Sequence, residues 1–259
     1  MQKITIVKVG GRVVETPESL QELLTDFVAL EGHKILVHGG GRSATKIAEQ
    51  LGIKTKMVDG RRITDLETLK VVTMVYAGLV NKNIVASLQA KGANSVGLTG
   101  ADLNLIKAIK RPVKDIDYGY VGDVVSVQTE ELTELINKNV VPVIAPLTHD
   151  GMGNMLNTNA DTMASSLACA LAQTFDVNLV YCFEKKGVLS NPDDDDSVIE
   201  NLTHKLFKEY QESGIIAEGM IPKLDNGFNA LKSGVKKINI TNTQGLKAGL
   251  NSGTTLTNE

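Results

Sequence analysis

Hydrophobic residues along the chain alternate between short apolar runs and longer stretches with helical spacing. The apolar runs predict buried strands at 3–9, 34–38, 95–98, 140–145, 177–182, 236–240 and 254–257. The helical spacing predicts helices near 17–31, 42–51, 65–91, 129–138, 159–174, 203–213 and 219–233. Alternation of strands with helices is typical of βαβ units. We therefore expect an α/β fold with a mostly parallel sheet.

Two segments interrupt this alternation. Residues 55–64 predict a short hairpin around Asp59 and Gly60, and residues 104–128 predict antiparallel strands and turns. The chain has no internal repeat and no composition typical of a linker. We therefore expect one domain covering residues 1–259.

The first apolar run ends in a lysine, Lys8, and two glycines follow closely, Gly10 and Gly11. A strand buried on both faces is an expensive place for an unpaired ammonium group. Glycine lets the backbone turn tightly and approach a ligand closely. A lysine in this position therefore predicts a bound anion, and the combination suggests a phosphate site.

Glycine-rich loops follow three of the predicted strands, at 10–11, 39–41 and 97–100. In open α/β sheets, ligands bind outside the carboxyl ends of the strands, and the helix N-termini there favour anions. The chain contains no Walker A motif. Residues 39–44 match a dinucleotide-binding turn, with Asp59 twenty residues beyond Gly39, but that alternative leaves Lys8 unexplained.

Two further segments carry candidate functional residues. Asn157, Asn159 and Asp161 surround the start of a predicted helix, where they fit either a helix cap or a binding site. Pro222 places Lys223 near a helix N-terminus, where a cation is unfavourable unless an anion lies nearby; a solvated lysine is the alternative.

Together these residues suggest phosphoryl transfer, which depends on positioning and on neutralising charge. Lys8 and Lys223 could hold phosphates from two sides, and Asp161 could order both ammonium groups. Arg62, in the predicted hairpin, is either a clamp for a carboxylate or a surface arginine. His38 precedes the second glycine loop, and we expect it to support that loop rather than act as a base.

Composition argues against several partners. The net charge is −3, tryptophan is absent and aromatic residues make up 4%, so we expect no nucleic-acid surface. We expect no membrane span, because no apolar stretch looks long enough to cross a bilayer. The first strand starts at residue 3, which leaves no room for a signal peptide. These features predict a soluble, cytoplasmic protein, and the four histidines show no metal-binding spacing.

Five motifs occur in order that together resemble the amino acid kinase family, in the branch that acts on N-acylglutamates. They are Lys8–Gly11, His38–Gly41, Gly60–Thr64, Asn157–Asp161 and Gly219–Lys223. The resemblance implies a three-layer αβα sandwich on an eight-stranded, mostly parallel open sheet. It also implies an N-lobe at about 1–175 for the acylglutamate and dimerisation, and a C-lobe at about 176–259 for ATP.

The implied reaction is ATP-dependent phosphorylation of the side-chain carboxylate of N-acetyl-L-glutamate, or of another N-acylglutamate such as N-succinyl, in the second step of arginine biosynthesis. The catalytic residues implied are Lys8, Lys223 and Asp161. The substrate-binding residues implied are Gly40, Gly41, Arg62, Asn157 and Asn159. The ATP-binding residues implied are Lys8, Gly10, Gly11, Gly41, Glu184 and Lys223. Mg²⁺ would be held through the nucleotide phosphates, without protein ligands.

The acceptor carboxylate of a glutamate side chain ordinarily has a pKa of about 4.3, so it is ionised at neutral pH and needs no general base. The chemical obstacle is the approach of two anions, which explains a site rich in cations and N–H donors.

Two places depart from the family pattern. One is the stretch 183–189, and the other is Met57, where some relatives carry a lysine. Met57 leaves undecided which acyl group the substrate carries. We also expect a homodimer that arginine does not inhibit. Another amino acid kinase, or a non-catalytic amino-acid sensor, is the alternative.

Overall fold

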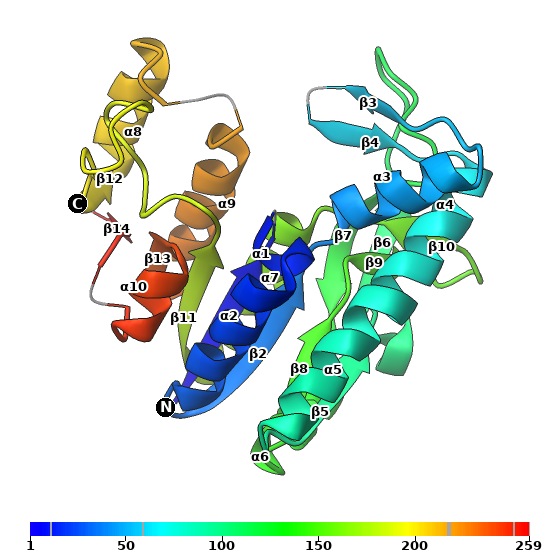
Figure 1. Ribbon diagram of the computed structural model, residues 1–259, viewed down its shortest axis with the longest axis horizontal. Coiled ribbons are helices and arrows are strands. Elements are labelled where there is room, and N and C mark those ends of the chain that lie inside the picture. Colours follow the sequence, from blue (N-terminus) through cyan, green and yellow to red (C-terminus); the bar gives the residue numbers. More distant parts are fainter. Residues whose placement is uncertain (11, 59, 217–218, 251, 259) are drawn as a thin grey trace. The chain divides into compact units, whose positions relative to one another are not determined.

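The computed structural model describes residues 1–10, 12–58, 60–216, 219–250 and 252–258 (Figure 1). The chain forms two compact units. Unit 1 comprises Met1–Ile35 and Ala164–Glu259, and unit 2 comprises Leu36–Met163. The expected division into lobes near residue 175 stays a prediction.

The main sheet has eight strands in the order β12-β14-β13-β11-β1-β2-β8-β5. Their bounds are β1 (Gln2–Val9), β2 (His33–His38), β5 (Ser95–Leu98), β8 (Val141–Ile144), β11 (Phe175–Cys182), β12 (Asn201–Thr203), β13 (Lys237–Thr241) and β14 (Thr254–Thr257). The pairing is parallel for β1 with β11, β11 with β13, β12 with β14, β2 with β8 and β5 with β8, whereas β13 and β14 are antiparallel. The predicted eight-stranded, mostly parallel α/β fold is confirmed.

Helices cover both faces of the unit 1 strands. They are α1 (Arg12–Glu15), α2 (Pro17–Ala29), α8 (His204–Glu212), α9 (Ile221–Lys232), α10 (Thr243–Lys247) and the end of α7 (Ala160–Leu171). In α9, Gly227 lies against Ile238, whereas Gly245 of α10 lies against Thr241. Side chains alternate between the faces of a strand, so Ile238 and Thr241 face opposite ways. The two helices therefore lie on opposite faces of β13 (Figure 1).

Unit 2 contains the remaining strands and a long helix. Its further elements are α3 (Gly41–Gln50), β3 (Lys56–Val58), β4 (Arg61–Ile63), α4 (Leu66–Val72), the π-helical η1 (Thr73–Val80), α5 (Asn81–Ala90), the 3₁₀ turn η2 (Asp102–Asn104), β6 (Ile106–Lys110), β7 (Gly122–Val127), α6 (Glu130–Asn137), β9 (Leu147–His149) and β10 (Met155–Asn157). The predicted hairpin is formed by β3 and β4, and β6 pairs with β7 in an antiparallel arrangement. Asp59, at the turn of the hairpin, lies outside the described residues.

Some short elements differ from the sequence prediction. The strands β9, β10 and β12 have three residues each, and α1 and α10 have four and five. Such segments are only slightly longer than one period of a helix or a strand, so a hydrophobic pattern cannot reveal them. The predicted helix at 65–91 is present, but its middle third is π-helical.

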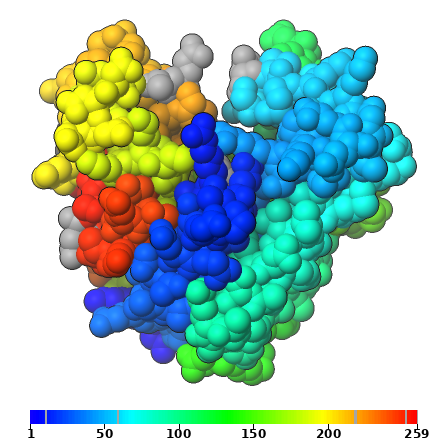
Figure 2. All heavy atoms as spheres, in the orientation of Figure 1, coloured from blue at the N-terminus to red at the C-terminus, as the bar shows by residue number. Residues whose placement is uncertain are grey.

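The expectation that no apolar stretch is long enough to cross a bilayer is wrong. One helix has the length and the composition that a membrane span requires. The stretch Leu66–Ala90 has 25 residues. An 18-residue segment within it has a mean hydropathy of 1.4, and 44% of that segment is buried. Leu69, Ile84 and Leu88 belong to the buried core, as in a core helix of a globular unit. The opposite side lies at the surface of unit 2 (cyan to teal in Figure 2), where Met74 is 55% exposed.

Candidate active site

Arg62 is a buried cation on the hairpin of unit 2. Only 9% of its surface is exposed. Its Nη2 donates to the carbonyl oxygen of Gly41 and to Oγ1 of Thr45, both at 2.8 Å. Its Nη1 is buried without a hydrogen-bond partner among the described residues, and the two acceptors of Nη2 are both uncharged. A buried guanidinium that has only neutral acceptors is suited to bind an anion.

Asn157 is connected to Arg62 through one side chain that sequence analysis missed. The amide of Asn157 donates to Oγ1 of Thr64 at 3.0 Å, and that hydroxyl donates to the carbonyl oxygen of Arg62 at 3.3 Å. Thr64 is fully buried, so this connection is shielded from water. The structure therefore brings Arg62, Gly41 and Asn157 together in one hydrogen-bonded cluster, and their role as a binding site stays a prediction.

Asn159 caps helix α7. Its Oδ1 accepts hydrogen bonds from the backbone N–H groups of Asp161 at 2.8 Å and Thr162 at 3.0 Å. The capping alternative for Asn159 is therefore correct for the oxygen of its amide. The cap does not use the amide NH₂ group, so the side chain is still able to donate to a ligand. Asp161 is buried in the first turn of α7, at 6% exposure.

In the glycine loop after β2, position 40 is packed too tightly for a side chain. Gly40 precedes α3, and a Cβ at Gly40 would lie 2.9 Å from Cδ1 of Tyr76 in η1. Tyr76 is buried, which raises the pKa of its hydroxyl, and the hydroxyl also interacts with Arg62. Tyr76 was not singled out from the sequence, where it looks like any aromatic residue of a core helix. Tyr76 thus packs against Gly40 and interacts with the guanidinium of Arg62.

In unit 1, Lys8 lies on β1 with 9% of its surface exposed. The Nζ of Lys8 lies close to Gly10: a Cβ at position 10 would be 2.7 Å from that atom. Glycine is therefore required at position 10 if Lys8 is to keep this conformation. Gly11, also expected to bind ATP, lies outside the described residues.

Lys223 and Glu184 also belong to unit 1. Lys223 is a partly exposed residue in the first turn of α9, where Pro222 starts the helix as predicted. Glu184 is exposed in the loop after β11, and its Oε1 accepts from the backbone N–H of Arg12 at 2.7 Å. This bond ties the loop after β11 to the loop after β1. The convergence of Lys8 and Lys223 with Asp161, which belongs to unit 2, stays a prediction.

The loop after β11 contains compensating charges. Lys185 pairs with Asp195 at 2.7 Å and Lys186 with Asp196 at 2.5 Å. All four side chains are substantially exposed, so the run of four aspartates at 193–196 lies in a solvated loop. Within the described ranges, no group of three or more histidine, cysteine, aspartate or glutamate side chains is arranged to hold a metal ion.

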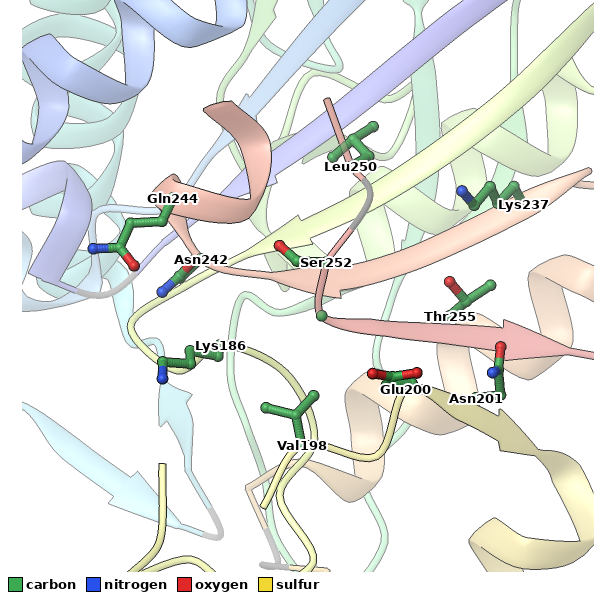
Figure 3. Close-up of a pocket in the computed structure, with 11 residues that line it drawn as sticks. Lys186, Val198, Glu200, Asn201, Lys237, Asn242, Gln244, Leu250, Ser252 and Thr255 are labelled. Atoms are coloured by element: carbon green, nitrogen blue, oxygen red, sulfur yellow. The ribbon is translucent and has the colours of Figure 1, made fainter. Parts of the chain in front are cut away.

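A separate polar cavity of about 520 Å³ lies in unit 1, over β13, β14 and β12 (Figure 3). Its lining includes Lys186, Glu200, Lys237 and Asn242. None of the described residues that are predicted to bind ATP lines it.

Comparison with known proteins decides the family. The profile of the amino acid kinase family matches residues 3–242. The chain belongs to the amino acid kinase family. The resemblance inferred from the motifs is thereby confirmed, and it extends over nearly the whole chain.

Within the amino acid kinase family, the chain is similar to proteins named acetylglutamate kinase. It is 63% identical to the Bacteroides thetaiotaomicron protein over 246 residues, covering 95% of this chain and 96% of the relative. It is 65% identical to the Bacteroides fragilis (strain ATCC 25285) protein over 240 residues, covering 93% and 92%. The Methanopyrus kandleri protein is 40% identical over 248 residues, covering 94% and 97%.

Solved structures of amino acid kinase fold share the architecture. The smu.665 protein from Streptococcus mutans UA159 gives a TM-score of 0.80 at 27% identity, with 98% of both chains covered. N-acetylglutamate synthase from Neisseria gonorrhoeae, complexed with coenzyme A and N-acetyl-glutamate, gives a TM-score of 0.82 at 22% identity. It covers 100% of this chain and 60% of that chain, and at this identity the likeness concerns the fold alone.

Proposed function

We propose that the chain is an acetylglutamate kinase. It transfers the γ-phosphoryl group of ATP to the side-chain carboxylate of N-acetyl-L-glutamate and forms the 5-acyl phosphate, the second step of arginine biosynthesis. Relatives with this name are 63–65% identical over more than nine-tenths of both chains. The structural observation that carries the proposal is the buried Arg62, with its unpartnered Nη1.

Unit 2 would bind the acceptor. In the proposed complex, Arg62 and Asn157 hold the α-carboxylate, and the NH₂ group of Asn159 donates to the acylamino group. The backbone N–H groups of Gly40 and Gly41, at the start of α3, would face the reacting carboxylate. Support comes from the shared hydrogen-bond cluster of Arg62, Gly41 and Asn157, and from the affinity of helix N-termini for anions.

Unit 1 would bind ATP. Lys8, Lys223 and the N–H groups of Gly10 and Gly11 would contact the phosphates, with further contacts from Gly41 of unit 2. Glu184 would contribute through the backbone of its loop, because an exposed carboxylate repels phosphate. Asp161 would order the two lysines. The acceptor carboxylate is already ionised, so the residues act by neutralising charge and by positioning.

Mg²⁺ would be bound by the ATP phosphates and water. This fits the donor set, because the described residues present no cluster of carboxylates for a protein-bound octahedral site. The bound ion supplies charge neutralisation between the phosphates. The cationic residues proposed above, Lys8 and Lys223, would share that task.

We further propose a cytoplasmic homodimer without nucleic-acid or membrane partners. Three apolar side chains on the helix Leu66–Ala90 are exposed and offer a surface for a second copy: Leu66, Met74 and Leu79. Light scattering coupled to gel filtration tests this. A mass near twice 27.8 kDa supports a dimer, and a mass near 27.8 kDa contradicts it.

The proposed activity is tested by trapping the acyl phosphate with hydroxylamine in the presence of ATP and Mg²⁺. The acceptors are N-acetyl-L-glutamate, N-succinyl-L-glutamate, glutamate, aspartate and carbamate, with N-acetyl-L-glutamine as the control without a side-chain carboxylate. We expect the hydroxamate with N-acetyl-L-glutamate. Product from glutamate or aspartate alone would favour another amino acid kinase. Binding without turnover, measured by calorimetry, would favour a sensor.

A further inference from the structure

A buried polar cluster lies behind the glycine loop of unit 2. His38, the last residue of β2, is fully buried, and Asn81, the first residue of α5, is 1% exposed. Lys82 follows Asn81 in the sequence, and its Nζ lies beside the side chain of Asn81. Buried polar groups require hydrogen-bond partners, so the donors and acceptors in this cluster must match.

Two neighbours allow only one orientation of the Asn81 amide. Lys82 Nζ donates to Oδ1 of Asn81 at 3.0 Å, and an ammonium group cannot accept. Nδ2 of Asn81 donates to the carbonyl oxygen of Val143 at 2.9 Å, and a carbonyl cannot donate. Rotating the amide by 180° would break both bonds. The second N–H of Asn81 therefore points at Nε2 of His38, 3.1 Å away.

The Asn81 amide in turn determines the tautomer of His38. Nε2 faces a donor and must accept, so the ring proton resides on Nδ1. Nδ1 lies 2.6 Å from the carbonyl oxygen of Gly39, to which it donates. Burial, with the nearby charge of Lys82, lowers the pKa of His38 to about 4, so the ring is neutral at pH 7.

The His38 contact determines where the next N–H group points. In a planar trans peptide, the carbonyl of Gly39 and the N–H of Gly40 point in opposite directions. His38 holds the carbonyl on the buried side, so the Gly40 N–H points away from the cluster. The cluster also joins three neighbouring strands, because Lys82 Nζ donates to Gly97 of β5 at 3.0 Å and Val143 belongs to β8.

We propose that Asn81 and Lys82 are positioning residues, which act through the Nδ1–H tautomer of His38 to aim the Gly40 N–H at the reacting carboxylate. The tautomer follows from the geometry of the cluster alone. The effect on phosphoryl transfer rests on the proposed kinase function. None of these three side chains is proposed to touch the substrate.

The first test measures the tautomer directly in the unliganded protein. Long-range ¹H–¹⁵N spectra of histidine-labelled protein at pH 7 distinguish the two neutral tautomers, and the His38→Asn variant assigns the signal among four histidines. We expect a neutral His38 with its proton on Nδ1. A proton on Nε2, or on both nitrogens, overturns the proposed cluster whether or not the protein is a kinase.

The second test changes Asn81 to Asp, which replaces a donor with an acceptor of nearly the same shape. We expect the His38 proton to move to Nε2, or the ring to become charged. We also expect kcat to fall about 10- to 100-fold with the KM for ATP little changed, because the acceptor is displaced rather than lost. Asn83→Asp, an exposed position on the same helix, is the matched control and should change neither readout.

Lys82→Met keeps the length of the side chain, and the exposed position makes this a milder variant should Asn81→Asp fold poorly. We expect a smaller loss of kcat in the same direction, with recovery in Lys82→Arg. Variants that shift the tautomer but leave kcat unchanged would overturn the positioning role. Loss of the native circular dichroism together with activity in every variant except the controls would show a purely structural cluster and also contradict it.

Discussion

Arg62 is a single buried charge in the proposed acceptor site. Its Nη2 is held by Gly41 and Thr45, which leaves Nη1 for a ligand. Arg62→Ala should raise the KM for N-acetyl-L-glutamate about 10- to 100-fold with a smaller effect on kcat, because charge-assisted hydrogen bonds contribute about 1.5–3 kcal/mol and the clamp also binds the ground state. Steady-state kinetics measures this, with the exposed neighbour in Arg61→Ala as the control.

The partner of Arg62 is identified by changing the substrate as well. N-acetyl-L-isoglutamine keeps the side-chain carboxylate but has an α-carboxamide. If Arg62 binds the α-carboxylate, the protein and substrate changes should not add in a double-mutant cycle. Additive losses would place Arg62 elsewhere.

Gly10 is a residue at which one methyl group should displace the ammonium of Lys8, which is proposed to be catalytic. A Cβ there would lie 2.7 Å from Lys8 Nζ, so Gly10→Ala must move the flexible end of the lysine. We expect kcat to fall at least about tenfold, with thermal stability nearly unchanged, because positioning by about 1 Å affects rate strongly. Gly78→Ala is the matched control, since nothing lies within 4 Å of a Cβ at that position. Equal kinetics in both variants would contradict the role of Lys8.

At the scale of single elements, α7 allows structure and binding to be separated at one residue. Asn159→Ala removes the cap and should cost about 1 kcal/mol of stability, whereas Asn159→Asp keeps an oxygen acceptor and should fold as stably as the parent. Both variants lack the amide NH₂ group and should raise the KM for the acylglutamate. Urea unfolding and kinetics measure the two effects. A normal KM in Asn159→Asp would restrict Asn159 to capping.

The elements also show what sequence could predict. The long strand β1 and the helix start at Pro17 were evident because apolar runs and proline act locally. The partners that organise the site were not evident, because they are distant in sequence: Asn157 and Thr64 are 93 residues apart, and Asn81 and Val143 are 62 apart. Thr64 and Asn81 resemble ordinary polar residues until the fold brings those partners together.

At the scale of the whole molecule, the buried His38 should make stability depend on pH. Its folded pKa of about 4 lies below the ordinary value of 6.5, so the stabilising contribution is present above pH 6.5 and is lost as pH falls toward 4. We expect a loss of about 2 kcal/mol between pH 7 and pH 5 from this group. Urea unfolding followed by circular dichroism should show it, and the slope should flatten in His38→Asn. An equal slope in both proteins would contradict a neutral, buried His38.

The proposed activity of this member of the amino acid kinase family is phosphorylation of the side-chain carboxylate of N-acetyl-L-glutamate. Phosphorus NMR of the protein with ATP, Mg²⁺ and N-acetyl-L-glutamate observes the product without a trapping reagent. We expect an acyl phosphate signal that grows in step with ADP, and no such signal with N-acetyl-L-glutamine. Formation of ADP with inorganic phosphate as the only other product would contradict this activity. So would the absence of ADP with every N-acylglutamate.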